Sequence, residues 1–215
     1  MRSHSFVTKN FYHIYVHGVS DFSIFRQTAD YNRFMSLLFC ANGSKPIPRL
    51  DFTYDYLSQA WEIRDQKVDI GKPIVGLVVF SLIPTHIHLL LEEKQDRGIS
   101  TYLHKILTSH AKYFNIKYDR RGHLFESKFN SRHINNNRYL LYVSKYIHRN
   151  PEKISRYRKS YVSYPWSSYH DFIGHNRWGG LLNIEPIISQ FKSKESYRDY
   201  VSEPMRDDFP DNPFN

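Results

Sequence analysis

The stretch IVGLVVFSLIPTHIHLLL, residues 74–91, decides the fold. Residues 74–83 are almost wholly apolar and rich in β-branched side chains, which predicts a buried strand. Pro84 and Thr85 then form a tight turn, and residues 86–91 form a second strand. We therefore expect a β-hairpin at the centre of a sheet.

The chain around this hairpin carries alternating and helical hydrophobic patterns in a regular order. The sequence predicts a strand at 11–17, a helix at 29–39, a helix at 99–118, a short strand at 129–134 and a helix at 138–150 that Pro151 stops. The order strand, helix, strand, strand, helix, strand is that of the ferredoxin-like split βαβ arrangement. We therefore predict an α+β fold with a central antiparallel sheet and an added helix after the last strand.

The sequence also suggests how the chain is divided. The main domain is expected at residues 1–160, followed by a C-terminal helical extension at 161–202 and a flexible acidic tail at 203–215. Within the extension, a helix is predicted over 185–201. Residues 41–73 are expected to form a connection with some structure of its own.

The composition indicates a basic, aromatic-rich globular protein. Its 215 residues include 30 Lys and Arg, 21 Asp and Glu, 17 Tyr and 15 Phe, for a formal charge of +9. The single cysteine, Cys40, cannot form an internal disulfide. No apolar stretch approaches the roughly 20 residues that a membrane helix needs, and the N-terminus has no signal-peptide pattern. We expect a cytoplasmic protein with no membrane partner.

The positive charge is concentrated in one part of the chain. Residues 101–160 contain 14 Lys and Arg against three acidic residues, and aromatic residues are interleaved with them. Basic faces with stacking rings are typical of proteins that bind single-stranded nucleic acid, although rings at these positions also fill cores. The candidate phosphate contacts are Lys105, Lys112, Arg120, Arg121, Lys128 and Arg132, with Lys145 and Arg149 beside the tyrosines of the last predicted helix.

Two histidines in the hairpin could bind a metal ion. His86 and His88 are two residues apart on a predicted strand, so both point to one face. Neutral imidazoles placed in this way suit divalent ions, although a solvent-facing pair would show the same spacing. Asn150 is a candidate third ligand. Tyr142, Tyr146 and Asn150 share one helix face, so either tyrosine could attack a metal-bound phosphate, or both could belong to a packing stripe.

Other catalytic motifs are missing from the sequence. It contains no Cys-x-x-Cys, no His-Glu-x-x-His, no Walker loop and no Gly-x-Ser-x-Gly elbow. Zinc hydrolases of those types, NTPases and serine hydrolases therefore have no support.

Four motifs occur in order along the chain: PTHIHLLL at 84–91, RGHLFESKF at 121–129, YIHRNP at 146–151 and YPWSS at 164–168. Together they resemble the motifs of the single-tyrosine HUH transposases, the IS200-like transposases, and most closely those of the REP-associated tyrosine transposases. The first predicted strand is also similar, except that Val16 and His17 stand where the family usually has Asn-Arg before a glycine.

The resemblance implies a set of roles. His86, His88 and Asn150 would hold a divalent ion, Mg²⁺ or Mn²⁺, and Tyr146 would be the nucleophile, with Tyr142 as its close rival. The implied activity is that of a single-stranded DNA endonuclease and strand transferase. It would act near DNA hairpins such as REP-like palindromes through a 5′-phosphotyrosine intermediate, at the nucleoid of a bacterial cytoplasm. A monomer and a homodimer both stay open.

Two alternative hypotheses use the same fold. A non-catalytic protein that binds hairpin DNA or structured RNA would show the same basic stretch, but it would not need His86, His88, Tyr146 and Asn150 together. A metal-dependent ribonuclease would not need the tyrosine, because RNA supplies its own 2′-hydroxyl as nucleophile.

Overall fold

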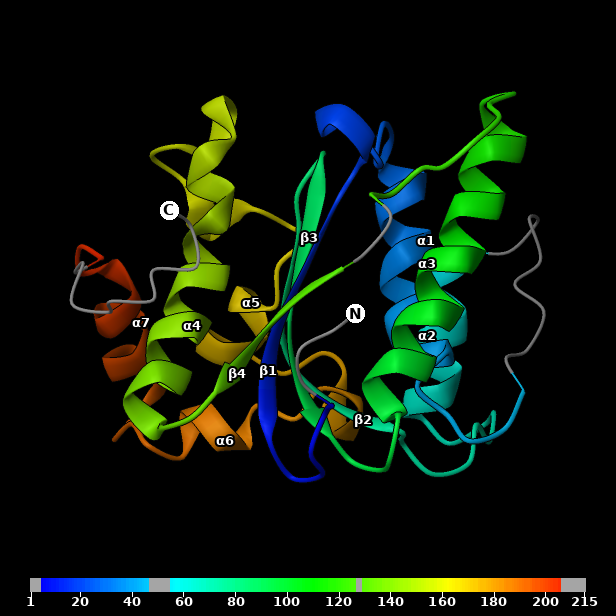
Figure 1. The fold of residues 1–215 in the computed structure, drawn as a ribbon. Helices are drawn as coiled ribbons and strands as arrows, with labels where there is room; N and C mark the ends of the chain where they lie inside the picture. Colours follow the sequence, from blue (N-terminus) through cyan, green and yellow to red (C-terminus); the bar gives the residue numbers. More distant parts are fainter. Residues whose placement is uncertain (1–4, 47–54, 127–128, 206–215) are drawn as a thin grey trace.

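The computed structural model describes residues 5–46, 55–126 and 129–205. A four-stranded sheet lies between two layers of helices (Figure 1). Its strands are β1 (Phe11–His17), β2 (Val75–Leu82), β3 (His86–Glu93) and β4 (Asn130–Ile134), and all neighbouring pairs are antiparallel. The spatial order β2-β3-β1-β4 is that of the predicted ferredoxin-like arrangement.

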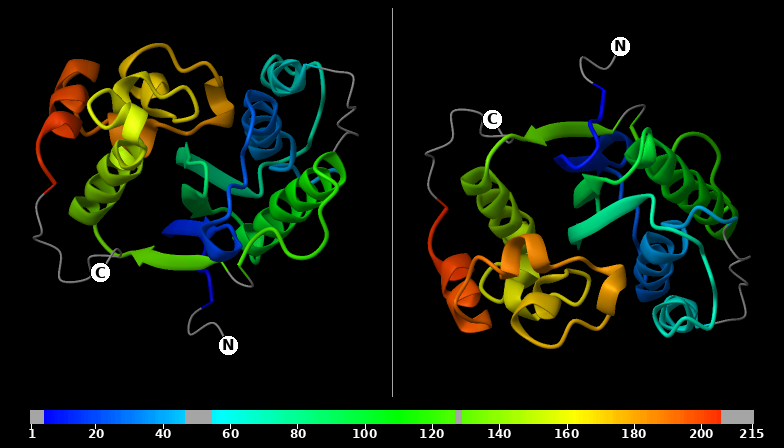
Figure 2. Two further views of the ribbon diagram at one scale, coloured as in Figure 1. Left: turned by 90° about the horizontal axis from the view of Figure 1, so that it is seen from above. Right: turned by 90° about the horizontal axis from the view of Figure 1, so that it is seen from below.

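The helices divide between the two faces of the sheet (Figure 2). One layer consists of α1 (Thr28–Cys40), α2 (Tyr56–Arg64) and α3 (Gly98–Lys117). The other consists of α4 (Asn137–Arg149), α5 (Tyr169–Ile173), α6 (Glu185–Ile188) and α7 (Lys194–Ser202). Short 3-10 helices occur at Val19–Asp21, Asn150–Lys153, Ser155–Tyr157, Tyr161–Ser163 and Gly179–Leu181.

A buried carboxylate joins α1 to α3. Asp30, in the first turn of α1, accepts hydrogen bonds from Tyr113 Oη (2.8 Å), Lys117 Nζ (2.7 Å) and Tyr118 Oη (2.7 Å). Burial alone would raise the pKa of Asp30, but these bonds and one from the backbone of Arg26 outweigh it and lower the pKa to about 2. The carboxylate is therefore ionised and fully hydrogen-bonded inside this layer.

A histidine fixes α4 against the C-terminal extension, residues 161–202. His148 is fully buried, and its Nδ1 lies 2.7 Å from Tyr197 Oη on α7. Its Nε2 lies 2.8 Å from Ser168 Oγ, next to α5. Because α4 packs on the sheet with one side and on the extension with the other, both sides of the helix are buried.

The sequence predicted that both strands of the hairpin lie at the centre of the sheet, and this prediction is wrong for one of them. β3 is an inner strand, but β2 lies at the edge. An edge strand this apolar is possible because the extension covers it: Ser168 N donates to Phe80 O (3.0 Å) and Asn183 N to Leu77 O (2.8 Å). Residues 161–202 thus cover the edge of the sheet and share one hydrophobic core with it.

Two further segments differ in detail from the prediction. The single helix expected over 185–201 is two helices, because the Ser193 side chain accepts a hydrogen bond from Ser196 N and starts α7 anew. The connection 41–73 contains α2, whose first turn is capped by Asp55. Most of the predicted acidic tail, residues 206–215, lies outside the described residues.

No helix within the described ranges combines the length and the apolar character required to cross a membrane.

Candidate active site

The predicted metal ligands and tyrosine meet at one end of the sheet, where β3 begins and α4 ends; we call it the site end. His86 and His88 lie at the start of β3 with their rings toward α4. His86 Nε2 is 3.0 Å from Asn150 Oδ1 at the end of α4. The ring of Tyr146 meets the ring of His88 edge-on, with centroids 5.5 Å apart.

Asn150 keeps its place on the helix face although a proline follows it. Its φ of −52° and ψ of −32° are helical, and the chain continues from it into the 3-10 helix Asn150–Lys153. Proline is tolerated there because the first residues of a helix need no amide donor. The spacing of one turn between Tyr146 and Asn150, which the sequence suggested, is therefore real.

The three donor side chains fit a divalent ion. Two ligands of one octahedral ion at about 2.1 Å stand roughly 3 Å apart, close to the 3.0 Å between His86 Nε2 and Asn150 Oδ1. Among the described residues no group of three His, Cys, Asp or Glu could hold a metal, so an ion held by His86 and His88 would need the amide oxygen of Asn150 as a third ligand. Two imidazoles and an amide oxygen suit Mn²⁺ and related ions better than Mg²⁺.

Both histidines are in the neutral form that binds metals. Burial lowers the pKa of His86 to about 4, although the hydrogen bond with Asn150 opposes this shift. Burial also lowers the pKa of His88 well below its usual value, and the nearby charges of His13 and His86 would add to the effect. At neutral pH each ring therefore keeps a nitrogen lone pair for an ion.

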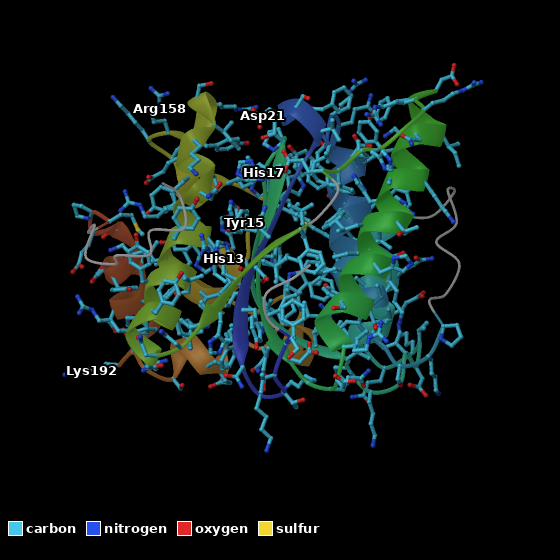
Figure 3. The ribbon with its side chains drawn as sticks, viewed as in Figure 1. His13, Tyr15, His17, Asp21, Arg158 and Lys192 are labelled. Atoms are coloured by element: carbon cyan, nitrogen blue, oxygen red, sulfur yellow. The ribbon has the colours of Figure 1, made fainter. Side chains whose placement is uncertain are left out.

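Strand β1 adds a second row of rings to the site. His13, Tyr15 and His17 alternate along β1 on the face that looks toward α4 (Figure 3). The pairing places Tyr15 opposite His88 and His17 opposite His86. His13 Nε2 lies 3.0 Å from His88 Nδ1, and the two rings stack with centroids 5.2 Å apart.

The turn after β1 requires a glycine. A Cβ at Gly18 would lie 2.2 Å from the carbonyl oxygen of Phe22, and Gly18 N donates to Thr85 O at 2.8 Å. The hydrogen bond to Thr85 holds the end of β1 against the turn that precedes His86.

The two candidate tyrosines of α4 have different surroundings. Tyr146 contacts both His13 and His88 with its ring. Tyr142, one turn earlier, stacks on Tyr139 with centroids 6.4 Å apart. Burial raises the pKa of Tyr146, and the hydrogen bond with Asn150 opposes that rise, so the resting hydroxyl is protonated. Of the two tyrosines, Tyr146 is therefore the one that lies against a predicted metal ligand, His88.

The cation beside the tyrosine hydroxyl is not one that the sequence suggested. Lys145 is buried, with Nζ 4.7 Å from the centroid of the Tyr200 ring. Arg149 pairs with Glu152 at 2.9 Å. It is Lys153 whose Nζ donates to Tyr146 Oη, at 2.9 Å.

The other candidate phosphate contacts are spread over the molecule. Lys105 donates to Gly43 O (2.9 Å) and Lys112 is exposed, both on α3, across the sheet from α4. Arg120 donates to His123 O (2.6 Å), while Arg121 is exposed in the same loop. That loop leads to residues 124–126, whose backbone bonds to residues 17 and 19 at the site end. Arg132 is exposed on β4, and Lys128 lies outside the described residues.

Comparison with known proteins bears on the same part of the chain. Residues 69–150 match the profile of the family described as "Transposase IS200 like". Over this segment, which is less than half of the chain, the protein is similar to the IS200-like transposases. The segment contains His86, His88, Tyr146 and Asn150, so the set of side chains gathered at the site end lies wholly within the part that carries the family likeness.

A solved structure of a REP-associated tyrosine transposase bound to a REP hairpin aligns over 86% of this chain and 88% of that chain, with 14% sequence identity and a TM-score of 0.48. A search of curated protein sequences gives no match.

Proposed function

We propose that this protein is a metal-dependent single-stranded DNA endonuclease and strand transferase that forms a covalent 5′-phosphotyrosine through Tyr146. One observation carries the proposal: His86 Nε2 and Asn150 Oδ1 are 3.0 Å apart, with Tyr146 against His88. The fold brings these two residues, 64 positions apart in sequence, within contact distance, which supports a shared role. A DNA-binding protein without catalysis has no use for it.

The chemistry follows from the resistance of a phosphodiester to attack by nucleophiles. A divalent ion held by His86, His88 and Asn150 would withdraw negative charge from the phosphate and orient it. Tyr146 Oη attacks the phosphorus and loses its proton to solvent, while the bond from phosphorus to the 3′ oxygen breaks and that oxygen takes up a proton. The products are a 5′-phosphotyrosine and a free 3′-hydroxyl.

The covalent intermediate also explains how strands could be rejoined. The phosphotyrosine keeps the energy of the broken bond, so a 3′-hydroxyl can attack it and release the tyrosine. The reaction needs no nucleotide triphosphate, in line with a sequence that has no Walker loop.

We propose single-stranded DNA next to a hairpin as the substrate. Exposed cations flank the site end on both sides: Arg121 in the loop before β4, and Arg158 beyond α4 (Figure 3). A single strand lying across the site end would place phosphates near both. The ordered motifs that resemble those of REP-associated transposases support the hairpin.

The first prediction tests the nucleophile with Tyr146→Phe and Tyr142→Phe. Tyr146→Phe removes one oxygen from the site, so it should abolish the covalent adduct with a labelled hairpin substrate in the presence of Mn²⁺ or Mg²⁺. Tyr142→Phe removes the same atom one helical turn away and should keep most of the activity. The measurement is the fraction of DNA that migrates with protein in a denaturing gel.

Both variants should bind the hairpin as the wild type does. An adduct that persists in Tyr146→Phe and vanishes in Tyr142→Phe would transfer the role to Tyr142. If the wild type binds the hairpin tightly but forms no adduct with any divalent ion, the alternative of a non-catalytic DNA-binding protein is supported instead.

A further inference from the structure

Lys153 reaches the tyrosine hydroxyl because of the way α4 ends. The 3-10 helix Asn150–Lys153 continues from α4 without a break and carries Lys153 back over Tyr146. Its Nζ is 2.9 Å from Tyr146 Oη and 5.2 Å from the centroid of the same ring. The lysine therefore contacts the atom that would react.

The other cations of this helix end are directed elsewhere. Arg149 pairs with Glu152, and Lys145 lies against Tyr200 of α7. A cation at this position favours a negative charge on the phenolic oxygen of Tyr146.

We propose that Lys153 is a catalytic residue that stabilises the negative charge on Tyr146 Oη during strand cleavage and rejoining, an inference that rests on the proposed function. In cleavage, Tyr146 loses its proton to solvent and its oxygen bonds to phosphorus as the 3′ oxygen leaves; the ammonium of Lys153 keeps its three protons and donates one hydrogen bond throughout. In rejoining, the same hydrogen bond stabilises the tyrosine oxygen as it leaves the phosphorus.

This need is set by the surroundings of Tyr146. Tyr146 is buried, with 9% of its surface exposed, so a phenolate there without a charged partner would be costly. A charged donor aimed at the developing charge lowers that cost without requiring the site to rearrange. Burial therefore makes a negative charge on Tyr146 Oη less stable, and the contact with Lys153 makes it more stable.

The test compares Lys153→Met with Lys159→Met, which removes an exposed positive charge six residues further on. The rate of adduct formation is measured in a single turnover with saturating hairpin DNA and Mn²⁺. We expect Lys153→Met to be roughly 10- to 100-fold slower, the usual loss when one charge-stabilising donor is removed. Lys159→Met should react at nearly the wild-type rate, and Lys153→Arg should recover part of the loss.

A second measurement separates charge stabilisation from a structural role. Tyr146 is replaced by a fluorinated tyrosine whose phenol is more acidic, in both the wild-type and the Lys153→Met background. If Lys153 stabilises the phenolic oxygen, a more acidic phenol depends on it less. The difference in the rate of adduct formation between the two backgrounds should then be smaller with fluorotyrosine than with tyrosine. Equal differences with tyrosine and fluorotyrosine would overturn the inference, as would a wild-type rate in Lys153→Met.

The failure of the broader proposal looks different. If the wild type forms no adduct, the phosphotyrosine mechanism itself fails. If the wild type forms the adduct and Lys153→Met matches it, only the role of Lys153 fails. Circular dichroism and Mn²⁺ affinity, both expected to be unchanged in Lys153→Met, show that the variant is folded with its site intact.

Discussion

His13 and His88 share one hydrogen bond, and that bond decides which nitrogen of His88 can face an ion. For Nε2 of His88 to keep its lone pair, Nδ1 must carry the proton. Nδ1 lies 3.0 Å from His13 Nε2, so His13 can accept that proton in a hydrogen bond and hold the ring in the ligating tautomer. Metal-binding histidines commonly depend on such a partner.

Replacing His13 should therefore weaken metal binding. His13→Phe keeps most of the ring volume but leaves His88 Nδ1 without its acceptor, and we expect Mn²⁺ to bind roughly 10- to 100-fold more weakly. Isothermal titration calorimetry gives the affinity. The control is His133→Phe, which changes an exposed histidine on β4 that bonds Asn10 instead. If both variants bind Mn²⁺ like the wild type, His13 does not set the tautomer.

Among the individual residues of the candidate site, the sequence predicted those that are paired by their spacing within one strand or one helix. His86 and His88 are two apart on a strand, and Tyr146 and Asn150 one turn apart on a helix, so each pair could be found without a structure. His13 and Lys153 could not be identified in the same way. The role of His13 depends on which strand lies beside β3, and that of Lys153 on a 3-10 turn that places it over a residue seven positions earlier.

A signal for His13 was nevertheless present. The split βαβ arrangement places its first strand next to its third, so the alternating residues 13, 15 and 17 had to line up beside 86 and 88 on one face or the other. Combining the predicted topology with the alternation would have suggested a larger imidazole cluster than the two histidines of the hairpin.

At the scale of elements, the buried Asp30 carboxylate that joins α1 to α3 should make the free energy of unfolding fall at acidic pH. The folded-state pKa of Asp30 is lowered from 3.8 to about 2, so its contribution is fully present above about pH 4 and is lost as pH falls through about 2. A shift of this size corresponds to about 2 kcal/mol of unfolding free energy at neutral pH. Asp30→Asn should remove it.

Urea denaturation of the wild type and of Asp30→Asn at several pH values checks this prediction. The difference in unfolding free energy should be largest near pH 7 and should shrink toward pH 2. Asp69→Asn, at an exposed ion pair with Lys45, is the matched control and should change stability little at any pH. A pH-independent difference for Asp30→Asn would mean that lost packing, not lost charge, is responsible.

The elements themselves were largely predictable, and the errors share a cause. Strand β1 has the predicted bounds, and β3, α3 and α4 differ by one or two residues at an end. The errors concern the packing between elements that are distant in sequence. A wholly apolar strand suggested the centre of a sheet, because the sequence does not reveal that residues 166–183 cover the outer edge of β2.

At the scale of the whole molecule, we expect the contribution of a positive charge to DNA affinity to depend on its distance from the site end. Arg158 is exposed near the site end, and Lys192 is exposed at the opposite end (Figure 3). If DNA crosses the site end, Arg158→Gln should reduce the slope of log affinity against log salt by about 0.7, the value for one phosphate contact on a single strand. Lys192→Gln removes the same charge and should leave the slope unchanged.

Fluorescence anisotropy with a labelled hairpin substrate, repeated at several salt concentrations, gives both slopes. Equal reductions in the two variants would show that the protein attracts DNA through its total charge rather than along one path. A loss confined to Lys192→Gln would place the DNA at the far end of the molecule, away from Tyr146.

The covering of β2 by the extension also has a consequence for synthesis on the ribosome. Ser168, which bonds to the outer edge of β2, is made 88 residues after Phe80. At cellular rates of translation this interval lasts on the order of 5 to 20 seconds. During that time the nascent chain displays an apolar strand with an open edge, the kind of surface that pairs with other chains. Slower translation of residues 83–168 should therefore increase the demand for chaperones on this protein more than slower translation before residue 75.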